Sequence, residues 1–218
     1  MYSLYTLSNK NIYEFPNSMY TCEEMNKKEQ TQNLVIHTCC ADCLLNSIQN
    51  LECRDIINKR TKITLLFYNP NIHPRSEYIE RLNAVKKILG KLKETYNLEL
   101  VIPNYSPKEY IKEILGNFKT SEKRCLACWN VRIKYLFEYA MKNNIPNVTT
   151  TLLSSHYQDK EIIKTIAKHF EEETNINFVE IDDSSNSKHS GFYKQNYCGC
   201  CFSLTEKMVQ SNNKLREE

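Results

Sequence analysis

Length, composition and charge indicate one compact domain and exclude several classes of protein. The chain has 218 residues, of which 41% are hydrophobic and 25% charged, with only 4 Gly and 6 Pro. Disordered, collagen-like and coiled-coil proteins are therefore excluded. No run approaches the roughly 18 consecutive apolar residues of a membrane span, and residues 1–33 carry no secretory signal. We expect a cytoplasmic protein without a membrane partner, whose net charge of +3 permits an RNA partner without indicating one.

Short β-rich runs alternate with helical periodicities along the chain. The expected strands are residues 34–37, 62–68, 98–102, 148–153 and 176–181. Between and after them, apolar residues recur at three- and four-residue steps. This periodicity predicts helices over residues 44–57, 78–96, 110–115, 129–141, 162–170 and 202–209.

The alternation predicts an α/β fold, a three-layer sandwich with a mostly parallel sheet of about five strands and right-handed crossovers. We expect a polar N-terminal extension over residues 1–32, a single α/β domain over residues 33–210 and a tail over residues 211–218. The strand order does not follow from the pattern. Sites in such sheets lie beyond the carboxyl ends of the strands, so the segments that follow the predicted strands are the candidate site.

The first of these segments holds three of the 10 cysteines, Cys39, Cys40 and Cys43. They lie where the first strand turns into a helix, and the free N–H groups and dipole of a helix N-terminus stabilise thiolates. Small buried cysteines also pack tight turns, but three within five residues favour a functional role. We therefore predict metal binding or redox chemistry at this turn.

A second cysteine motif is the C-x-x-C pair of Cys125 and Cys128, at the start of the fourth helix. This spacing is typical of half a zinc site, of a thioredoxin-like dithiol or of two ligands of an iron–sulfur cluster. Together with Cys39 and Cys40 it supplies four thiolates, the number that an all-cysteine zinc site and a 4Fe-4S cluster both need. Spacing alone does not separate these two metals.

The third motif places Cys198 and Cys200 on either side of Gly199. Two cysteines so close can form only a small, strained disulfide, which would be labile and redox-active. Gly199 supplies the backbone freedom that such a ring requires. In the competing interpretation, these thiols are additional metal ligands. The remaining cysteines are assigned no role: Cys22, Cys53 and Cys201.

Five separated motifs resemble the cobalamin-independent epoxyqueuosine reductases of the QueH type. They are Cys39-Cys40-Ala41-Asp42-Cys43; Tyr68-Asn69-Pro70-Asn71-Ile72-His73-Pro74 with Glu77, Tyr78 and Arg81; Arg124-Cys125 with Cys128 and Arg132; Thr150-Thr151-Leu152-Leu153 with Tyr157 and Gln158; and Tyr193-Lys194-Gln195-Asn196-Tyr197-Cys198-Gly199-Cys200. They occur in the family's order over most of the chain.

The resemblance implies a Rossmann-like (HUP-like) fold and an oxidoreductase. Its activity would be the reduction of epoxyqueuosine at the wobble position of a tRNA to queuosine, the last step of that modification pathway. Its implied cofactor is a 4Fe-4S cluster bound by Cys39, Cys40, Cys125 and Cys128, and its implied redox-active pair is Cys198 and Cys200. Its implied partners are the epoxyqueuosine-containing tRNA and an unidentified electron donor.

Further candidate residues lie in the same strand-end motifs. Cys43 and Asp182 are candidates for an additional metal ligand. The candidate proton donors are His37, His73, Tyr197 and Asp182, for which a purely structural hydrogen bond or packing role is an equally good interpretation.

Two functions of a different class stay open on the residues alone. One is a zinc-stabilised RNA-binding module, in which four thiolates hold the fold and no reaction occurs. The other is a thiol–disulfide oxidoreductase that acts on proteins and needs no metal. The bound metal discriminates, because an iron–sulfur cluster is coloured and zinc is not.

Overall fold

The computed structural model describes residues 33–116, 120–181, 191 and 196–217, and the side chains among them up to residue 211. Within these residues a five-stranded, fully parallel sheet has the order β3-β2-β1-β4-β5. The strands are β1 (Leu34–His37), β2 (Lys62–Leu66), β3 (Asn97–Val101), β4 (Asn147–Thr150) and β5 (Asn177–Phe178). The predicted α/β fold with a parallel sheet of about five strands is confirmed.

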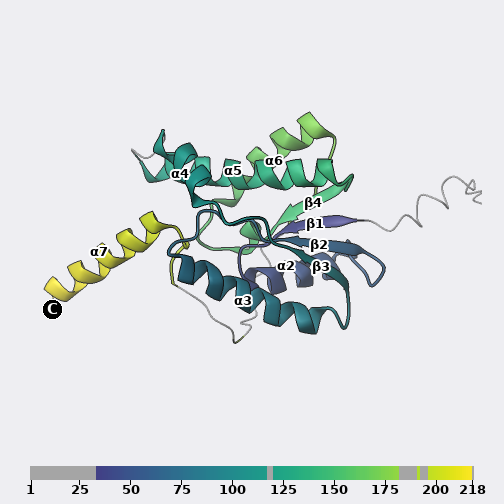
Figure 1. Cartoon of the computed structure of the whole chain (residues 1–218), viewed down its shortest axis with the longest axis horizontal. Helices are drawn as coiled ribbons and strands as arrows, with labels where there is room; N and C mark the ends of the chain where they lie inside the picture. Colours follow the sequence, from purple (N-terminus) through teal and green to yellow (C-terminus); the bar gives the residue numbers. More distant parts are fainter. Residues whose placement is uncertain (1–32, 117–119, 182–190, 192–195, 218) are drawn as a thin grey trace, which may run out of the picture. The chain divides into compact units, whose positions relative to one another are not determined.

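Helices cover both faces of this sheet and complete the three layers (Figure 1). The helical elements are α2 (Ala41–Cys53), α3 (Arg75–Leu92), α4 (Pro107–Leu115), α5 (Ser121–Lys142), the 3-10 turn η1 (Thr151–Ser154), α6 (Lys160–Thr174) and α7 (Cys201–Glu217). Helices α2 and α3 lie on one face, and α5 and α6 lie on the other. Every residue of β1 is buried, because this central strand has neighbours on both sides and helices on both faces.

Local sequence explains where the helices begin. The hydroxyl of Thr120 accepts from the backbone N–H of Lys123 and caps α5, and the carboxylate of Asp159 accepts from that of Ile162 and caps α6. Each helix also has a glutamate in its first turn, which favours the positive end of the helix dipole. The predicted helices therefore exist, but capping side chains extend several of them beyond their apolar periodicity.

The predicted fourth and fifth strands are shorter than expected. β4 ends at Thr150, because the Thr150 hydroxyl accepts from the Leu152 N–H and the chain turns into η1. β5 is confined to Asn177–Phe178 at the sheet edge, where only β4 pairs with it. The carboxyl end of β4 therefore carries a tight turn in place of an extended strand.

The strand order places a topological switch between β1 and β4. From β1 the chain builds β2 and β3 on one side, and it then returns to add β4 and β5 on the other. A crevice forms at such a switch beyond the carboxyl ends of the strands, because the flanking connections diverge to opposite faces. The cysteine-bearing turn after β1 lies at this position.

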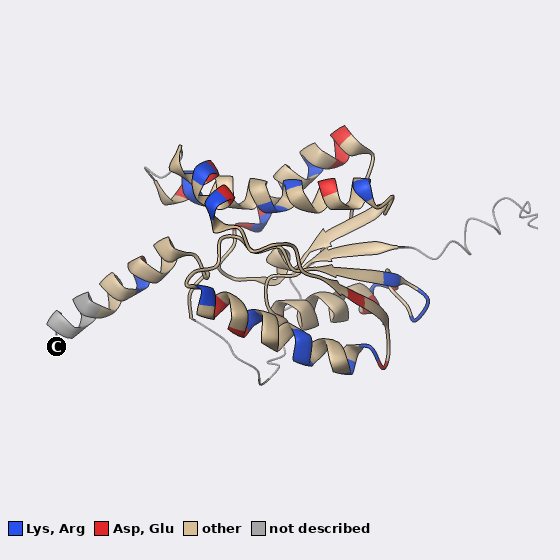
Figure 2. Ribbon diagram, viewed as in Figure 1, with Lys and Arg blue, Asp and Glu red and all other residues tan. Residues whose placement is uncertain are grey.

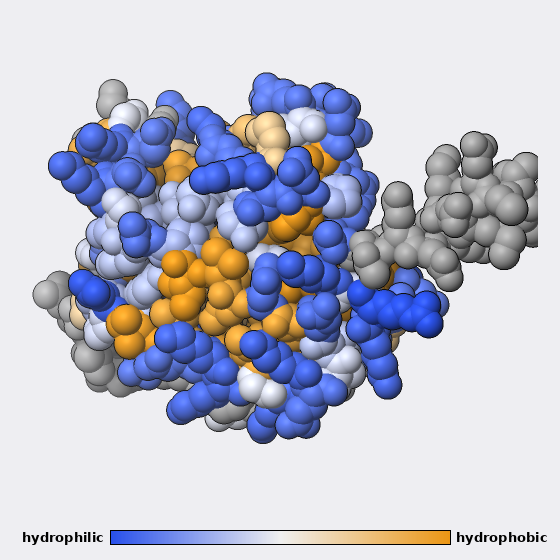
Figure 3. All heavy atoms as spheres, turned by 45° about the vertical axis from the view of Figure 1, so that its right-hand side comes forward, coloured by the Kyte–Doolittle hydropathy of each residue, from blue (hydrophilic) through white to orange (hydrophobic). Residues whose placement is uncertain are grey.

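Charged and apolar residues are distributed as expected around a buried core. Lys, Arg, Asp and Glu lie mainly along the helices and loops (Figure 2). One face shows an apolar area bordered by hydrophilic side chains (Figure 3). None of the helices in the described part of the chain has the length and apolar composition needed to cross a bilayer.

Candidate active site

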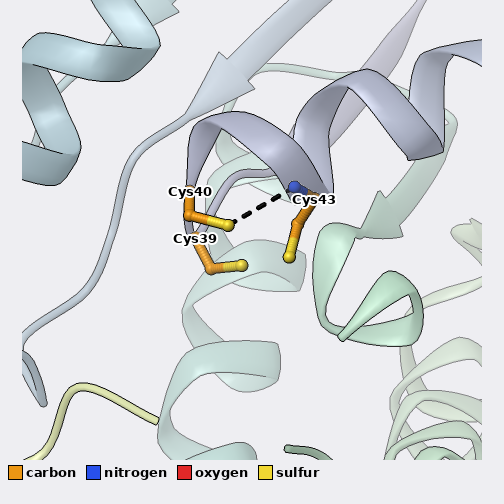
Figure 4. A group of neighbouring side chains, drawn as sticks. All are labelled: Cys39, Cys40 and Cys43. Atoms are coloured by element: carbon orange, nitrogen blue, oxygen red, sulfur yellow. Dashed lines mark hydrogen bonds between the residues drawn. The ribbon is translucent and has the colours of Figure 1, made fainter. Parts of the chain in front are cut away.

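Three thiols converge at the turn between β1 and α2 (Figure 4). The Sγ atoms of Cys39, Cys40 and Cys43 all lie within 4.8 Å of one another. Cys40 is the N-cap of α2, and its Sγ accepts from the backbone N–H of Cys43 at 3.4 Å. The first turn of α2 thus places Cys43 next to the N-cap residue Cys40, and Cys39 immediately precedes Cys40 in the chain. This cysteine triad has the donor atoms and spacing to hold a metal ion.

Hydrogen bonds within the triad concentrate negative charge on one sulfur. The pKa of Cys39 lies well below its ordinary value because the Cys40 and Cys43 thiols donate to it. The pKa values of Cys40 and Cys43 are raised for the same reason. Thr151 on η1 adds a donor, since its hydroxyl lies 3.1 Å from the Cys39 Sγ and accepts from the Cys39 N–H at 2.9 Å. The triad therefore favours a thiolate at Cys39.

A buried arginine supplies positive charge beside these thiols. Arg132 on α5 is 2% exposed, and its Nη2 donates to Asn69 Oδ1 at 2.9 Å. Asn69 is itself fixed, because its amide donates to the carbonyl of Thr38 at 2.9 Å. The Arg132 charge lowers the pKa of Cys39 and of Cys198. Its Nε makes no hydrogen bond to the described residues, so a donor is available to a bound group.

The C-x-x-C pair lies in the first turns of α5. Cys125 and Cys128 line a pocket together with Cys198, Cys200 and Phe202, which we call the α7 pocket. Burial raises the pKa of Cys128 to about 11 and also raises that of Cys125. Without a metal or another cation these two thiols therefore stay protonated at neutral pH.

Specific donors contact both sulfurs of the C-G-C pair. Gln158 Nε2 donates to Cys198 Sγ at 3.3 Å, and the Ser203 N–H, in the first turn of α7, donates to Cys200 Sγ at 3.4 Å. The pKa of Cys198 is lowered because the Cys200 thiol donates to it, and that of Cys200 is raised by the same bond. Cys198 is therefore the more nucleophilic of the two sulfurs.

Two neighbouring pockets share Cys198 as a lining residue. One is the α7 pocket. The other, which we call the triad pocket, is lined by residues that include Cys39, Cys40, Cys43, Arg81 and Arg132. Gln158 and Tyr157 also line both pockets. The three cysteine motifs, separated by up to 161 positions between Cys39 and Cys200, thus border two pockets with a common wall.

The structure gathers the predicted site residues but groups them differently from the expected ligand set. The tightest group among the described residues includes Cys43, and Cys125 and Cys128 lie in the adjoining pocket. The set Cys39, Cys40, Cys125 and Cys128 stays a prediction, as does the redox role of Cys198 and Cys200. Asp182 and Cys22 lie outside the described residues, Cys53 is exposed, and Cys201 begins α7.

His37 is not placed to donate a proton. It is fully buried, its Nε2 donates to the Tyr68 carbonyl, and its Nδ1 bonds to the Thr150 hydroxyl. Burial lowers its pKa to about 3, and the Arg132 charge adds to this effect. The neutral ring therefore links β1 to the ends of β2 and β4. This outcome favours the structural interpretation for His37.

Three residues of the site received no role from the sequence: Thr151, Gln158 and Arg81. These three and Arg132 belong to the quoted motifs, so the motifs contained the available signal. Their contacts join segments far apart in the chain, such as Gln158 with Cys198 and Arg132 with Asn69. Spacing along the chain does not encode such contacts.

Clustered thiols at the carboxyl edge of a parallel sheet, with a buried cation beside them, define a cysteine-based metal or redox protein of the α/β class. The sequence profile of the family "Epoxyqueuosine reductase QueH" matches residues 34–206, which is most of the chain. The chain therefore belongs to the epoxyqueuosine reductase QueH family.

Individual relatives agree with this assignment. The chain is 31% identical to the epoxyqueuosine reductase QueH of Thermotoga maritima over 188 residues, covering 80% of this chain and 91% of the relative. It is 28% identical to the protein of that name from Dehalococcoides mccartyi, covering 83% of this chain and 97% of the relative. It is also 28% identical to the protein of that name from Haemophilus influenzae, covering 95% of this chain and 84% of the relative. The similarity thus spans nearly the whole of each relative.

Proposed function

We propose that this protein reduces the epoxide of epoxyqueuosine in tRNA to the alkene of queuosine. The family profile over residues 34–206 includes all three cysteine motifs, and the fold brings those motifs to two pockets that share Cys198. This convergence carries the proposal, because a reductive deoxygenation needs an electron source beside the substrate.

The reaction balances with the Cys198 and Cys200 thiols as the reductant. The two thiols lose two electrons and two protons and form one disulfide bond. The epoxide gains the two electrons and two protons, its two carbon–oxygen bonds break, and its oxygen leaves as water. The donors that contact both sulfurs and the lowered pKa of Cys198 support this role. An unidentified electron donor then returns the disulfide to the dithiol.

The proposed cofactor is a 4Fe-4S cluster held by Cys39, Cys40, Cys125 and Cys128. A cluster ligated by thiolates needs four deprotonated sulfurs and a compensating charge. The Cys39 thiolate and the buried Arg132 cation, whose Nε has no hydrogen-bond partner among the described residues, fit that requirement. Cys43, the third member of the triad, is a further sulfur close to Cys39 and Cys40. When bound, such a cluster transfers electrons one at a time.

The triad pocket has features that suit an unstacked base with hydroxyl groups. The Asn71 Oδ1 atom is buried and has no hydrogen-bond partner among the described residues, and Asn71 lines this pocket. The rings of His156 and Tyr157 pack 3.9 Å apart in the same lining, and Tyr157 is 40% exposed. Proteins commonly stack unpaired RNA bases on such aromatic side chains. These features support a tRNA substrate, and a tRNA-modifying role supports the expected cytoplasmic location.

A single experiment separates this function from the alternatives. The purified protein is reconstituted anaerobically, once with iron and sulfide and once with zinc, and is incubated with epoxyqueuosine-containing tRNA and a strong reductant. We expect nucleoside mass spectrometry to detect loss of one oxygen atom with the iron–sulfur protein alone. A colourless zinc protein that binds the tRNA without changing the nucleoside would instead identify an RNA-binding module.

Substitution of single cysteines tests the division of roles. We expect Cys198→Ser to abolish turnover and to leave the bound iron and sulfide unchanged, because Cys198 is proposed as a reductant and not as a ligand. Cys53→Ser is the matched control, since Cys53 is exposed at the end of α2. Loss of the metal in Cys198→Ser would contradict the proposed ligand set.

A further inference from the structure

The turn that carries the redox pair is docked on the first turns of α3. Arg81 Nη1 donates to the carbonyl oxygen of Cys198 at 3.2 Å, and its Nε donates to Glu77 Oε1 at 2.6 Å. The Arg81 and Glu77 side chains are only 5% and 6% exposed. The buried carboxylate therefore orients the guanidinium toward a backbone group 117 positions further along the chain.

Gly199 fits this docking contact in two ways. Its φ of +110° is a backbone conformation that residues other than glycine rarely adopt. A Cβ atom at this position would lie 2.5 Å from Arg81 Nη2 and 2.8 Å from Arg81 Cζ. On the other side of the turn, the His73 N–H donates to the Gly199 carbonyl at 2.8 Å. The guanidinium and the His73 backbone thus both hold the turn.

The burial of this ion pair calls for a reason other than helix stability. Removing two charges from water costs free energy, which their mutual attraction often fails to offset. Lys134 and Glu138 form an exposed i,i+4 pair on α5, which requires no such burial. The Glu77–Arg81 pair differs because its guanidinium contacts the redox turn and also lines the triad pocket. The distinguishing feature of the buried pair is therefore its contact with Cys198 and Gly199.

We propose that Arg81, oriented by Glu77, is a positioning residue for the Cys198–Gly199–Cys200 turn. It holds the turn in the dithiol conformation, with Cys198 at the border of the two pockets. The docking contact stabilises the reduced pair relative to the disulfide and makes the pair a stronger oxidant once it is oxidised. This inference rests on the proposed role of the two thiols as the reductant.

The test measures the thiol–disulfide equilibrium of the pair without tRNA. Full-length protein is equilibrated anaerobically in glutathione buffers of graded composition, free thiols are alkylated, and mass spectrometry of the peptide with Cys198 and Cys200 gives the oxidised fraction. The variants are Arg81→Lys, which keeps the charge but not the forked donor, and Gly199→Ala. A third, the double variant Glu77→Gln with Arg81→Gln, leaves no unpaired buried charge.

We expect each variant to shift this equilibrium toward the disulfide by about tenfold, the size expected for one lost charge-assisted hydrogen bond. Single-turnover reduction of the nucleoside should slow although the dithiol is then the stronger reductant, because the turn no longer holds Cys198 at the border of the two pockets. Bound iron and sulfide should stay at the wild-type level. The control variant Lys134→Gln with Glu138→Gln should leave both measurements unchanged, since that pair is exposed. Circular dichroism verifies that each variant is folded.

The outcomes separate this proposal from the proposed function. A wild-type equilibrium in folded Arg81→Lys and Gly199→Ala would overturn the positioning role, whatever the activity. A shifted equilibrium in a protein whose wild type leaves epoxyqueuosine unchanged would support the positioning role and overturn the reductase function. Because Gly199→Ala removes neither charge of the ion pair, a shift in that variant also assigns the effect to the docked turn.

Discussion

At the scale of single residues, Gln158 shows how a neutral side chain can tune a thiol. The indole nitrogen of Trp129 is only a donor, and it lies 2.5 Å from Gln158 Oε1. The amide is therefore oriented with its carbonyl toward Trp129 and its NH2 group toward Cys198 Sγ, 3.3 Å away. This bond adds to the donation from Cys200, which is the main cause of the lowered Cys198 pKa.

We predict that Gln158→Leu raises the pKa of Cys198 and slows its alkylation at neutral pH, because the thiolate loses a donor. Trp129→Phe should act in the same direction more weakly, since the amide is then free to flip. The measurement is the rate of iodoacetamide labelling at Cys198 as a function of pH. Labelling of exposed Cys53 serves as the internal control. An unchanged pH profile in Gln158→Leu would show that this hydrogen bond does not stabilise the thiolate.

At the scale of elements, the early end of β4 is what brings η1 against the triad. Had the chain continued as a strand to residue 153, Thr151 would be part of the sheet. It lies instead at the start of η1, where its hydroxyl satisfies the Cys39 N–H at 2.9 Å and donates to the Cys39 sulfur. One residue therefore connects the ends of β1 and β4 and polarises a predicted metal ligand.

We predict that Thr151→Val lowers the free energy of unfolding of the metal-free protein by roughly 1–3 kcal/mol, the cost of a buried N–H left without an acceptor. Urea denaturation measures this loss. Thr165→Val is the matched control, because Thr165 is on exposed α6 surface and its hydroxyl only donates within the helix to Glu161. Equal stability of the two variants would contradict the structural role of Thr151.

The helix ends explain why element boundaries were harder to predict than element types. Apolar periodicity begins at Trp129, but α5 begins eight residues earlier, at Ser121, because Thr120 caps it there. The C-x-x-C pair consequently lies within the first turns of the helix. The sequence pattern detects the buried stripe of a helix, whereas the cap and the exposed first turn carry no apolar signal.

At the scale of the whole molecule, the site follows from the strand order. β1 and β4 are adjacent in the sheet, although 109 residues lie between His37, at the end of β1, and Asn147, at the start of β4. Their adjacency makes β1 the switch point, and it brings the turns after both strands together. A sheet of different order would separate Thr151 from Cys39 and leave the three cysteine motifs on different parts of its edge.

We predict that the domain from residue 33 onward folds and acts without residues 1–32. All the described site residues and the region matched by the family profile lie after residue 33. A chain that starts at residue 33 should have the same melting temperature and the same rate of nucleoside reduction as the full chain. Thermal denaturation and the tRNA assay test this, and loss of either property would show that the N-terminal segment contributes to the domain.

The sequence by itself determined the fold class and the types of its elements and identified the three cysteine motifs, because these depend on periodicity and on residue type over short distances. Only the tertiary structure decided the strand order, the sharing of Cys198 by two pockets and the contacts of Thr151, Arg132 and Arg81. Those features depend on how distant segments pack, and neither local propensity nor spacing along the chain contains that information.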